Sequence, residues 1–298
     1  MNTAANTPTL NSPTGGTLVT TTPTFTLTGT DSDGDNMQYK IKVCEDVGMT
    51  TNCQAFDQSQ LQTGWSGQNA DGGTTYTSGT QGTYTVQSAL SEGITHYWEG
   101  YTIDPSGTNT FSTASATDNF LTNSTPTAPT LLWVEGEVEP QYVTDSTPEF
   151  SAICNDADSG QILNKYRIQV DDSIDFGSTV WDSGASGTSM TDCTAGNRSS
   201  DISFGGTPLA LDTTNYYWRI KFWDALDAES AWSNESSFRM ADGSPTVCTI
   251  QESVDDTSLT LNWQDNTDNE TQFRIERNEN GAGFSLLINK AADSTSHE

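Results

Sequence analysis

The stretch Asn215–Ser233, which reads NYYWRIKFWDALDAESAWS, most constrains what this chain can fold into. Aromatic and β-branched residues alternate along its first half, a pattern typical of a β-strand with one face in a core. An acidic turn, DALDAES, follows, and AWSNESSFRM returns as a second strand. Strand, turn and strand predict an antiparallel hairpin. The face expected to be buried carries Tyr216, Trp218, Ile220 and Phe222.

This hairpin belongs to an internal repeat. PTFTLTGTDSDGDNMQYKIKV at 23–43 resembles PEFSAICNDADSGQILNKYRIQV at 148–170, and HYWEGYTIDPSGTNTFS parallels YYWRIKFWDALDAESAWS. Between these two segments, Trp65-Ser-Gly resembles Trp181-Asp-Ser-Gly. Short strands separated by turn residues, repeated along the chain, are typical of tandem β-sandwiches.

We therefore expect an all-β chain of tandem β-sandwiches, the last one truncated. The expected parts are a polar tail at 1–7, sandwiches at 8–122 and 129–241, a linker at 123–128 and half a sandwich at 245–298. Half a sandwich leaves a core face uncovered, so we expect 245–298 to be poorly ordered. An incomplete last module also predicts that the chain is a fragment of a longer protein.

The third unit, with LTLNW and FRIER, resembles the first half of a fibronectin type III domain. The second unit, with YYWRIKFWD and SAWS, is similar to the bacterial fibronectin-like modules of large secreted surface proteins. The first unit departs from the pattern, since His96 stands where the second has Tyr216, a candidate tyrosine corner. The resemblance implies tandem immunoglobulin-like or fibronectin type III-like sandwiches, the last one truncated. It hardly implies a function, because this sandwich hosts many unrelated roles.

The net charge is −29, from 40 acidic and 11 basic residues. A polyanion repels nucleic acid and anionic membrane surfaces, so neither is an expected partner. No window has the roughly 20 consecutive apolar residues of a membrane span. The first residues lack a signal-peptide pattern, so an extracellular or cell-surface location requires the signal to be absent from this fragment.

The excess of acidic residues has two interpretations: they form a solubilising surface, or those in the loops bind Ca²⁺. In this topology the B–C and F–G loops lie at the same pole, which brings distant carboxylates together, and Ca²⁺ takes six to eight oxygen ligands. The alternative is turn chemistry, which Asp, Asn and Gly also serve. The candidate Ca²⁺ ligands are Asp31, Asp33, Asp35 and Asp104 in the first unit, Asp156, Asp158, Asp224, Asp227 and Glu229 in the second, and Asp265, Asp268 and Glu270 in the third.

The cysteine spacing allows two local disulfides, Cys44–Cys53 and Cys154–Cys193, or buried free thiols. Exposed tryptophan rings could form a surface that binds carbohydrate, although most of the tryptophans are better explained by packing in the core. Trp223 is the candidate glycan contact, because strand alternation points it away from Trp218.

GxSxG and P-loop patterns are absent from the sequence. Paired carboxylates for glycoside hydrolysis stay open among 40 acidic residues, but the repeats argue against one unique cleft, and we expect a non-catalytic chain. The first hypothesis for its function is an extracellular adhesion, spacer or structural surface repeat. The second is a carbohydrate-binding or spacer region of a secreted polysaccharide-degrading enzyme, and the third is a filament or tail-fibre subunit. The expected partners are other domains of a longer chain, with a surface protein or glycan as a further option.

Overall fold

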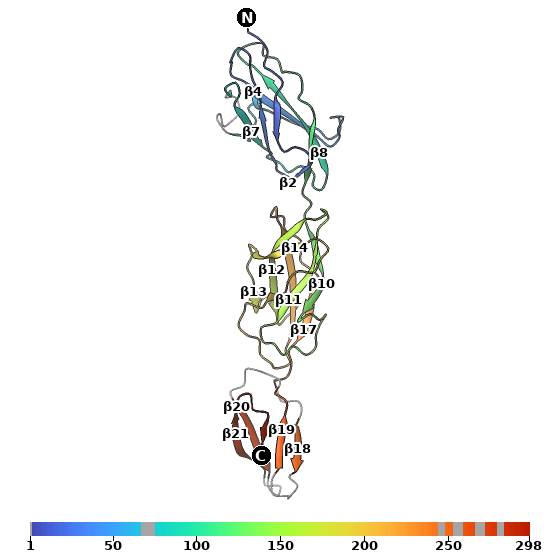
Figure 1. Cartoon of the computed structure of the whole chain (residues 1–298), viewed down its shortest axis with the longest axis vertical. Coiled ribbons are helices and arrows are strands. Elements are labelled where there is room, and N and C mark those ends of the chain that lie inside the picture. Colours follow the sequence, from blue (N-terminus) through green and yellow to red (C-terminus); the bar gives the residue numbers. More distant parts are fainter. Residues whose placement is uncertain (1, 67–74, 244–247, 253–258, 266–271, 279–282) are drawn as a thin grey trace. The chain divides into compact units, whose positions relative to one another are not determined.

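The computed structural model describes residues 2–66, 75–243, 248–252, 259–265, 272–278 and 283–298. The chain divides into two compact units, each built of strands joined by loops (Figure 1). Unit 1 comprises Met1–Thr127 together with two loops, Asp156–Gln161 and Asp224–Glu229, and unit 2 comprises the rest. None of the helices among the described residues is long and apolar enough to cross a membrane.

Unit 1 contains two sheets that enclose a core. One has the order β1-β3-β7-β6 and the other the order β2-β9-β8-β4-β5. Neighbouring strands are antiparallel except for β2 and β9, which are parallel. The elements are β1 (Thr9–Ser12), β2 (Thr17–Val19), β3 (Thr24–Thr28), β4 (Gln38–Cys44), β5 (Gln54–Asp57), the 3-10 turn η1 (Gln58–Gln60), β6 (Trp65–Ser66), β7 (Gln81–Thr85), β8 (Thr95–Ile103) and β9 (Asp118–Thr122).

The repeat in unit 2 also has two sheets, with the orders β10-β11-β15 and β13-β12-β16-β17, and β14 pairs with β12. The fold is thus all-β and built as tandem sandwiches, as expected. The strands are β10 (Thr127–Val134), β11 (Glu149–Asn155), β12 (Ile162–Asp171), β13 (Trp181–Asp182), β14 (Thr188–Thr194), β15 (Ile202–Ser203), β16 (Asn215–Asp224) and β17 (Ser236–Arg239).

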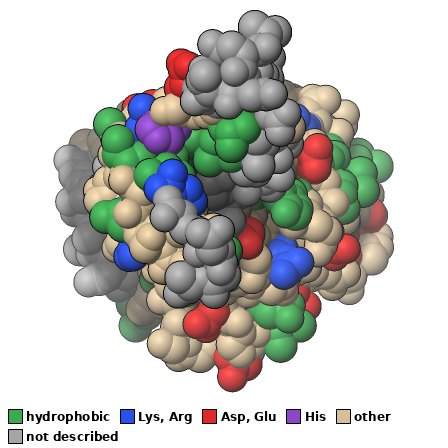
Figure 2. Space-filling model, turned by 90° about the horizontal axis from the view of Figure 1, so that it is seen from below, with side chains coloured by type: hydrophobic (Ala, Val, Ile, Leu, Met, Phe, Trp, Pro, Cys, Tyr) green, Lys and Arg blue, Asp and Glu red, His purple; other side chains and the backbone are tan. Residues whose placement is uncertain are grey.

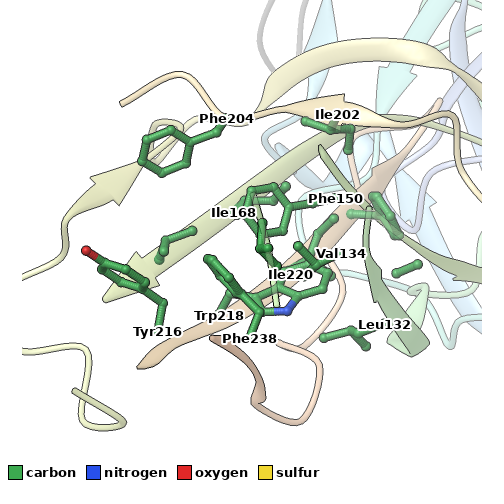
Figure 3. Packing of buried hydrophobic residues seen from close by; sticks show 14 of the residues in the cluster. Leu132, Val134, Phe150, Ile168, Ile202, Phe204, Tyr216, Trp218, Ile220 and Phe238 are labelled. Carbon is green, nitrogen blue, oxygen red and sulfur yellow. The ribbon is translucent and has the colours of Figure 1, made fainter. Parts of the chain in front are cut away.

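The core of each repeat contains an equivalent aromatic pair. Phe25 and Trp98 pack with ring centroids 4.8 Å apart and planes at 54°. Phe150 and Trp218 repeat the contact at 4.8 Å and 55° (Figure 3). All four side chains are fully buried. The two sequence repeats are therefore repeats of three-dimensional structure.

The residue that differs between the repeats keeps the same neighbour. Tyr216 of β16 stacks on Phe238 of β17, with centroids 5.5 Å apart. His96 of β8 stacks on Phe120 of β9, at 5.4 Å, and a ring nitrogen lies 3.0 Å from the carbonyl oxygen of Ser91. His96 is only 3% exposed. It is thus a packed replacement for the tyrosine.

The hairpin over Asn215–Ser233 is confirmed. The N–H of Asp224 donates to the carbonyl of Ala228, which closes the turn. The N–H groups of Ser230 and Ser233 donate to the carbonyls of Phe222 and Ile220. The returning chain then forms β17, in which Ser236 pairs with Trp218.

The likeness between Trp65 and Trp181 does not extend to their sheets. Trp65 pairs with Tyr84 of β7, whereas Trp181 pairs with Val170 of β12, which lies in the other sheet of its repeat. Only Trp65 is fully enclosed, at 2% exposed. A two-residue strand carries too little pattern to specify which sheet it joins.

Both expected disulfides are formed. Cys44, the last residue of β4, is bonded to Cys53 just before β5. Cys154 of β11 is bonded to Cys193 of β14, and this bond joins the two sheets of its repeat. The residues between the bonded cysteines close loops with sequence separations of 9 and 39.

The strands after residue 245 pair among themselves. Large apolar side chains there are exposed, among them Phe284 at 74% and Leu286 at 50%. β20 (Gln272–Asn278) and β21 (Phe284–Ala291) pair antiparallel, and residues 279–282 between them lie outside the described residues. The domain boundaries and the poor order expected of this segment stay predictions. Its strands are β18 (Cys248–Glu252), β19 (Leu259–Trp263), β20 (Gln272–Asn278), β21 (Phe284–Ala291) and β22 (Ser296–His297), in the sheets β18-β19-β22 and β20-β21.

Candidate functional site

The loop between β3 and β4 gathers three of the predicted carboxylates. Asp31, Asp33 and Asp35 each offer an oxygen, and these oxygens lie within 4.8 Å of one another. The carboxylate of Asp31 caps its own loop, since Oδ1 accepts the N–H groups of Asp33 and Asp35 over 2.8 and 3.4 Å. Elsewhere on the molecule, Figure 2 shows acidic side chains spread over the visible face rather than gathered.

Asp104 begins the loop between β8 and β9 and is completely buried. Its Oδ1 accepts the N–H groups of Ser106 and Gly107, both over 2.9 Å. Its Oδ2 and the Oδ2 of Asp31 are buried, and neither has a hydrogen-bond partner among the described residues. Asp31, Asp33, Asp35 and Asp104 are called the first acidic pole below.

The segment Asn2–Thr3 links the two loops of the first acidic pole. Asn2 donates from Nδ2 to Asp35 over 2.8 Å. The N–H and hydroxyl of Thr3 donate to Oδ2 of Asp33 over 2.6 and 2.8 Å, and they lower the pKa of that carboxyl. A Cβ placed on Gly107 would lie 1.9 Å from Oδ2 of Asp104 and 2.3 Å from Oδ1 of Asn2. These two oxygens therefore lie beside the same point.

The loops 156–161 and 224–229 of unit 1 form the second acidic pole, defined by Asp156, Asp158 and Asp224. Polar side chains fill it. Asn123 donates to Oδ2 of Asp224 over 2.6 Å, while Oδ1 accepts the N–H groups that follow in the turn. Ser124 donates to both oxygens of Asp158, over 2.6 and 2.9 Å.

One carboxylate of the second acidic pole, that of Asp156, lies in an environment that disfavours its charged form. Burial raises the pKa of Asp156, and the negative charges of Asp158 and Asp224 add to the rise. Its Oδ2 has no hydrogen-bond partner among the described residues. The three acids are thus close enough to interact, although the cluster of ligand oxygens found at Asp31 has no counterpart here within the described ranges.

The remaining predicted acids are not among the residues that define the two acidic poles. Asp227 and Glu229 are exposed in the turn after β16. Of the third unit, Asp265 lies within the described residues, while Asp268 and Glu270 lie outside them. The loop convergence expected of a sandwich is therefore seen in the first two repeats.

The residues that hold the acids were not among those predicted from the sequence. Asn2 and Thr3 lie in the expected polar tail, and Asn123 and Ser124 lie in the expected linker. A signal was present, because NTAANTPTL at 2–10 aligns without a gap to NSTPTAPTL at 123–131. Each asparagine then occupies the same place in its repeat and donates to a carboxylate of its acidic pole.

The predicted glycan contact is not an exposed ring. Trp223 is 6% exposed, with Lys221 over the ring at 5.2 Å and Gly187 packed against it. Strand alternation places Trp223 on the opposite face of β16 from Trp218, but that face is covered as well. Arg219 and Lys221 also lie over the ring of Trp232, both at 4.6 Å. Glycan contact at Trp223 stays untested, and its burial weighs against it.

The second repeat matches one sequence-family model. Residues 129–242 match the family model of the Rha78A-like, N-terminal immunoglobulin domain. The expected resemblance to immunoglobulin-like sandwiches is thereby confirmed for this range. Comparison with curated proteins gives no match.

Solved structures align weakly with the chain. The α-L-rhamnosidase of Dictyoglumus thermophilum has 19% identity over 47% of this chain and 17% of its own, with a TM-score of 0.34. That of Streptomyces avermitilis, complexed with L-rhamnose, has 24% identity over 42% and 12%, with a TM-score of 0.34. The FN1–FN3 domains of chicken CNTN1 have 8% identity over 100% and 88%, with a TM-score of 0.26. The chain spans less than a fifth of either rhamnosidase.

Proposed function

We propose that this chain is a non-catalytic accessory region of a secreted glycoside-degrading enzyme. The observation that carries the proposal is the match of residues 129–242 to the N-terminal immunoglobulin domain of Rha78A-like proteins. In this role the sandwiches space or orient a catalytic unit on the same polypeptide, which is the proposed partner. The favoured substrate class of that unit is α-L-rhamnosides.

Two structural features support an extracellular, non-catalytic role. The disulfides Cys44–Cys53 and Cys154–Cys193 suit an oxidising compartment. His96, one of the chain's two histidines, is buried against Phe120 and is out of reach of a substrate. The role of the chain is therefore mechanical, as stiff modules between other parts of the polypeptide.

The test captures the native protein with antibodies raised against residues 1–298. We expect the captured polypeptide to be longer than this chain and to hydrolyse an aryl α-L-rhamnoside, while the isolated chain has no activity. A captured protein without glycosidase activity on a panel of aryl glycosides would contradict the proposal.

The adhesion role and the filament role stay predictions, and neither gains a specific observation. Cell binding by the isolated chain would favour adhesion, and concentration-dependent polymers in light scattering would favour a filament.

A further inference from the structure

We propose that the first acidic pole is a Ca²⁺ site, formed by Asp31, Asp33, Asp35 and Asp104 with the side-chain oxygen of Asn2. The proposal does not depend on the accessory role of the chain. It begins from the three carboxylate oxygens of Asp31, Asp33 and Asp35, which lie within 4.8 Å of one another. Several carboxylates on neighbouring loops are the ligands that Ca²⁺ takes in proteins.

Turn chemistry explains only half of the buried carboxylate oxygens. The Oδ1 atoms of Asp31 and Asp104 accept backbone N–H groups of their own loops, as capping aspartates do. Their Oδ2 atoms are equally buried and have no donor among the described residues. Asp31 is 6% exposed and Asp104 is 0% exposed, so bulk water does not reach these two Oδ2 atoms. A buried charge without a partner is costly, and a cation removes that cost.

The orientation of Asn2 adds a third oxygen. Its Nδ2 donates to Asp35, so its Oδ1 is the atom beside Oδ2 of Asp104. If the amide of Asn2 were turned over, its oxygen would face the carboxylate of Asp35 instead, and two acceptors would again lie side by side. Two acceptors side by side repel each other unless a cation lies near both.

No basic side chain of this repeat neutralises the cluster. Residues 1–127 contain Lys40 and Lys42 as their basic residues. Lys40 lies over the rings of Tyr101 and Phe111, at 4.2 and 4.0 Å, and Lys42 donates to the carbonyl of Met49. The described ion pairs of the chain include none of the four aspartates.

The second acidic pole serves as an internal comparison. Asn123 donates to Asp224, and Gln161 donates to the side-chain oxygen of Asn123 over 2.9 Å. Every oxygen of Asp224 and the oxygen of Asn123 is thus satisfied by protein donors. The amide of Gln161 does in this loop what a cation does in the first. Oδ2 of Asp156 lacks a donor among the described residues here too, but three carboxylate oxygens gather within 4.8 Å of one another only at Asp31, Asp33 and Asp35 in the described part of the chain, so we expect Ca²⁺ at the first acidic pole alone.

The test titrates CaCl₂ into the chelator-treated chain 1–298 by calorimetry. We expect one site with a Kd on the order of 0.1–1 mM, the range of extracellular Ca²⁺ modules. The melting temperature of unit 1 should rise by about 5 °C in 10 mM CaCl₂. Absence of both the heat and the shift in the unmodified chain overturns the proposal.

Three variants locate the site. Asp31→Asn and Asp35→Asn should each weaken binding at least about tenfold, because each removes a charged ligand. Asp158→Asn, at the second acidic pole, should leave the Kd within about twofold. If circular dichroism shows that Asp31→Asn does not fold, Asp35→Asn decides, since Asp35 accepts a hydrogen bond from a side chain rather than from its own loop. Binding that is lost in Asp158→Asn and kept in Asp35→Asn overturns the assignment.

Discussion

The side-chain amide of Asn2 donates to Oδ2 of Asp35 over 2.8 Å, and this bond turns the side-chain oxygen of Asn2 toward Asp104. In the second repeat Asn123 holds the equivalent position, but its oxygen accepts a hydrogen bond from Gln161. The side-chain oxygen of Asn123 therefore faces a hydrogen-bond donor, whereas that of Asn2 faces the carboxylate of Asp104. The two acidic poles share this asparagine and differ in whether a protein donor satisfies its side-chain oxygen.

Gly107 should tolerate no side chain. A Cβ there would lie 1.9 Å from Oδ2 of Asp104, whose Oδ1 is held by backbone donors. We expect Gly107→Ala to lower the free energy of unfolding of unit 1 by about 1–3 kcal/mol. Calorimetric melting measures this. In the control Gly177→Ala the nearest atom would be 3.4 Å away, and the change should stay within about 0.5 kcal/mol. Equal effects of the two substitutions would contradict the contact.

The disulfide Cys154–Cys193 should stabilise its repeat more than Cys44–Cys53 does. The entropy that a cross-link removes from the unfolded chain grows with the closed loop, and the separations are 39 and 9 residues. Replacing both cysteines by alanine should lower the free energy of unfolding by about 4 kcal/mol in the first case and about 2.5 kcal/mol in the second. Urea unfolding of the two double variants makes the comparison. The reverse order would show that strain or residual structure outweighs the loop term.

The ion pair between Arg167 and Asp182 should make stability pH-dependent. Arg167 donates to both oxygens of Asp182, over 2.9 and 2.6 Å, and with Gln169 it holds the pKa of that carboxyl well below its usual value. A pKa depressed by folding stabilises the protein above the unfolded value of about 3.9, and the gain is lost as the pH falls below it. Asp182→Asn should therefore cost about 1–2 kcal/mol at pH 7 and less at pH 2.5.

Urea unfolding at the two pH values checks this prediction. The matched control is Asp201→Asn, because Asp201 pairs with Arg198 at the surface, where both side chains are at least 40% exposed. Its effect should be near zero at both pH values. A cost for Asp182→Asn that does not change with pH would mean that the charge of this carboxylate contributes nothing.

Trp223 should act as a core residue rather than as a binding surface. Its ring is 6% exposed. Trp223→Ala should lower the free energy of unfolding by about 3–5 kcal/mol, as for other buried aromatic truncations. Tyr142→Ala, at a position that is 64% exposed, should change it by less than about 0.5 kcal/mol. Thermal melting distinguishes the two. A stable Trp223→Ala variant that loses binding on a glycan array would instead support Trp223 as a glycan contact.

The core could be predicted from the sequence because strand alternation has a period of two, which places Trp218 and Phe222 on one face without further information. The two cysteine pairs followed from their spacing, and the placement of the loops after β3 and β8 at one pole followed from the sandwich topology. The opposite face of β16 could not be predicted in this way. Whether Trp223 is covered depends on Gly187, which lies in a connection that no local pattern positions.

The donors at the acidic poles also escaped prediction. Asn2 and Asn123 lie in polar stretches whose composition is that of a tail and a linker, and a hydrogen bond from a side chain leaves no periodicity. Only the gap-free likeness of 2–10 to 123–131 marks them. A repeat that extends beyond the sandwich strands is thus a useful indicator of residues with a structural role.

A CaCl₂ titration of the ¹⁵N-labelled chain, followed by amide chemical shifts, tests most directly whether the first acidic pole binds Ca²⁺. We predict saturable shifts for the amides of residues 31–35 and 104–107, together with those of Asn2 and Thr3. Amides of 156–161 and 224–228 should not move. Unchanged shifts at 31–35, or equal shifts at the second acidic pole, would contradict the account.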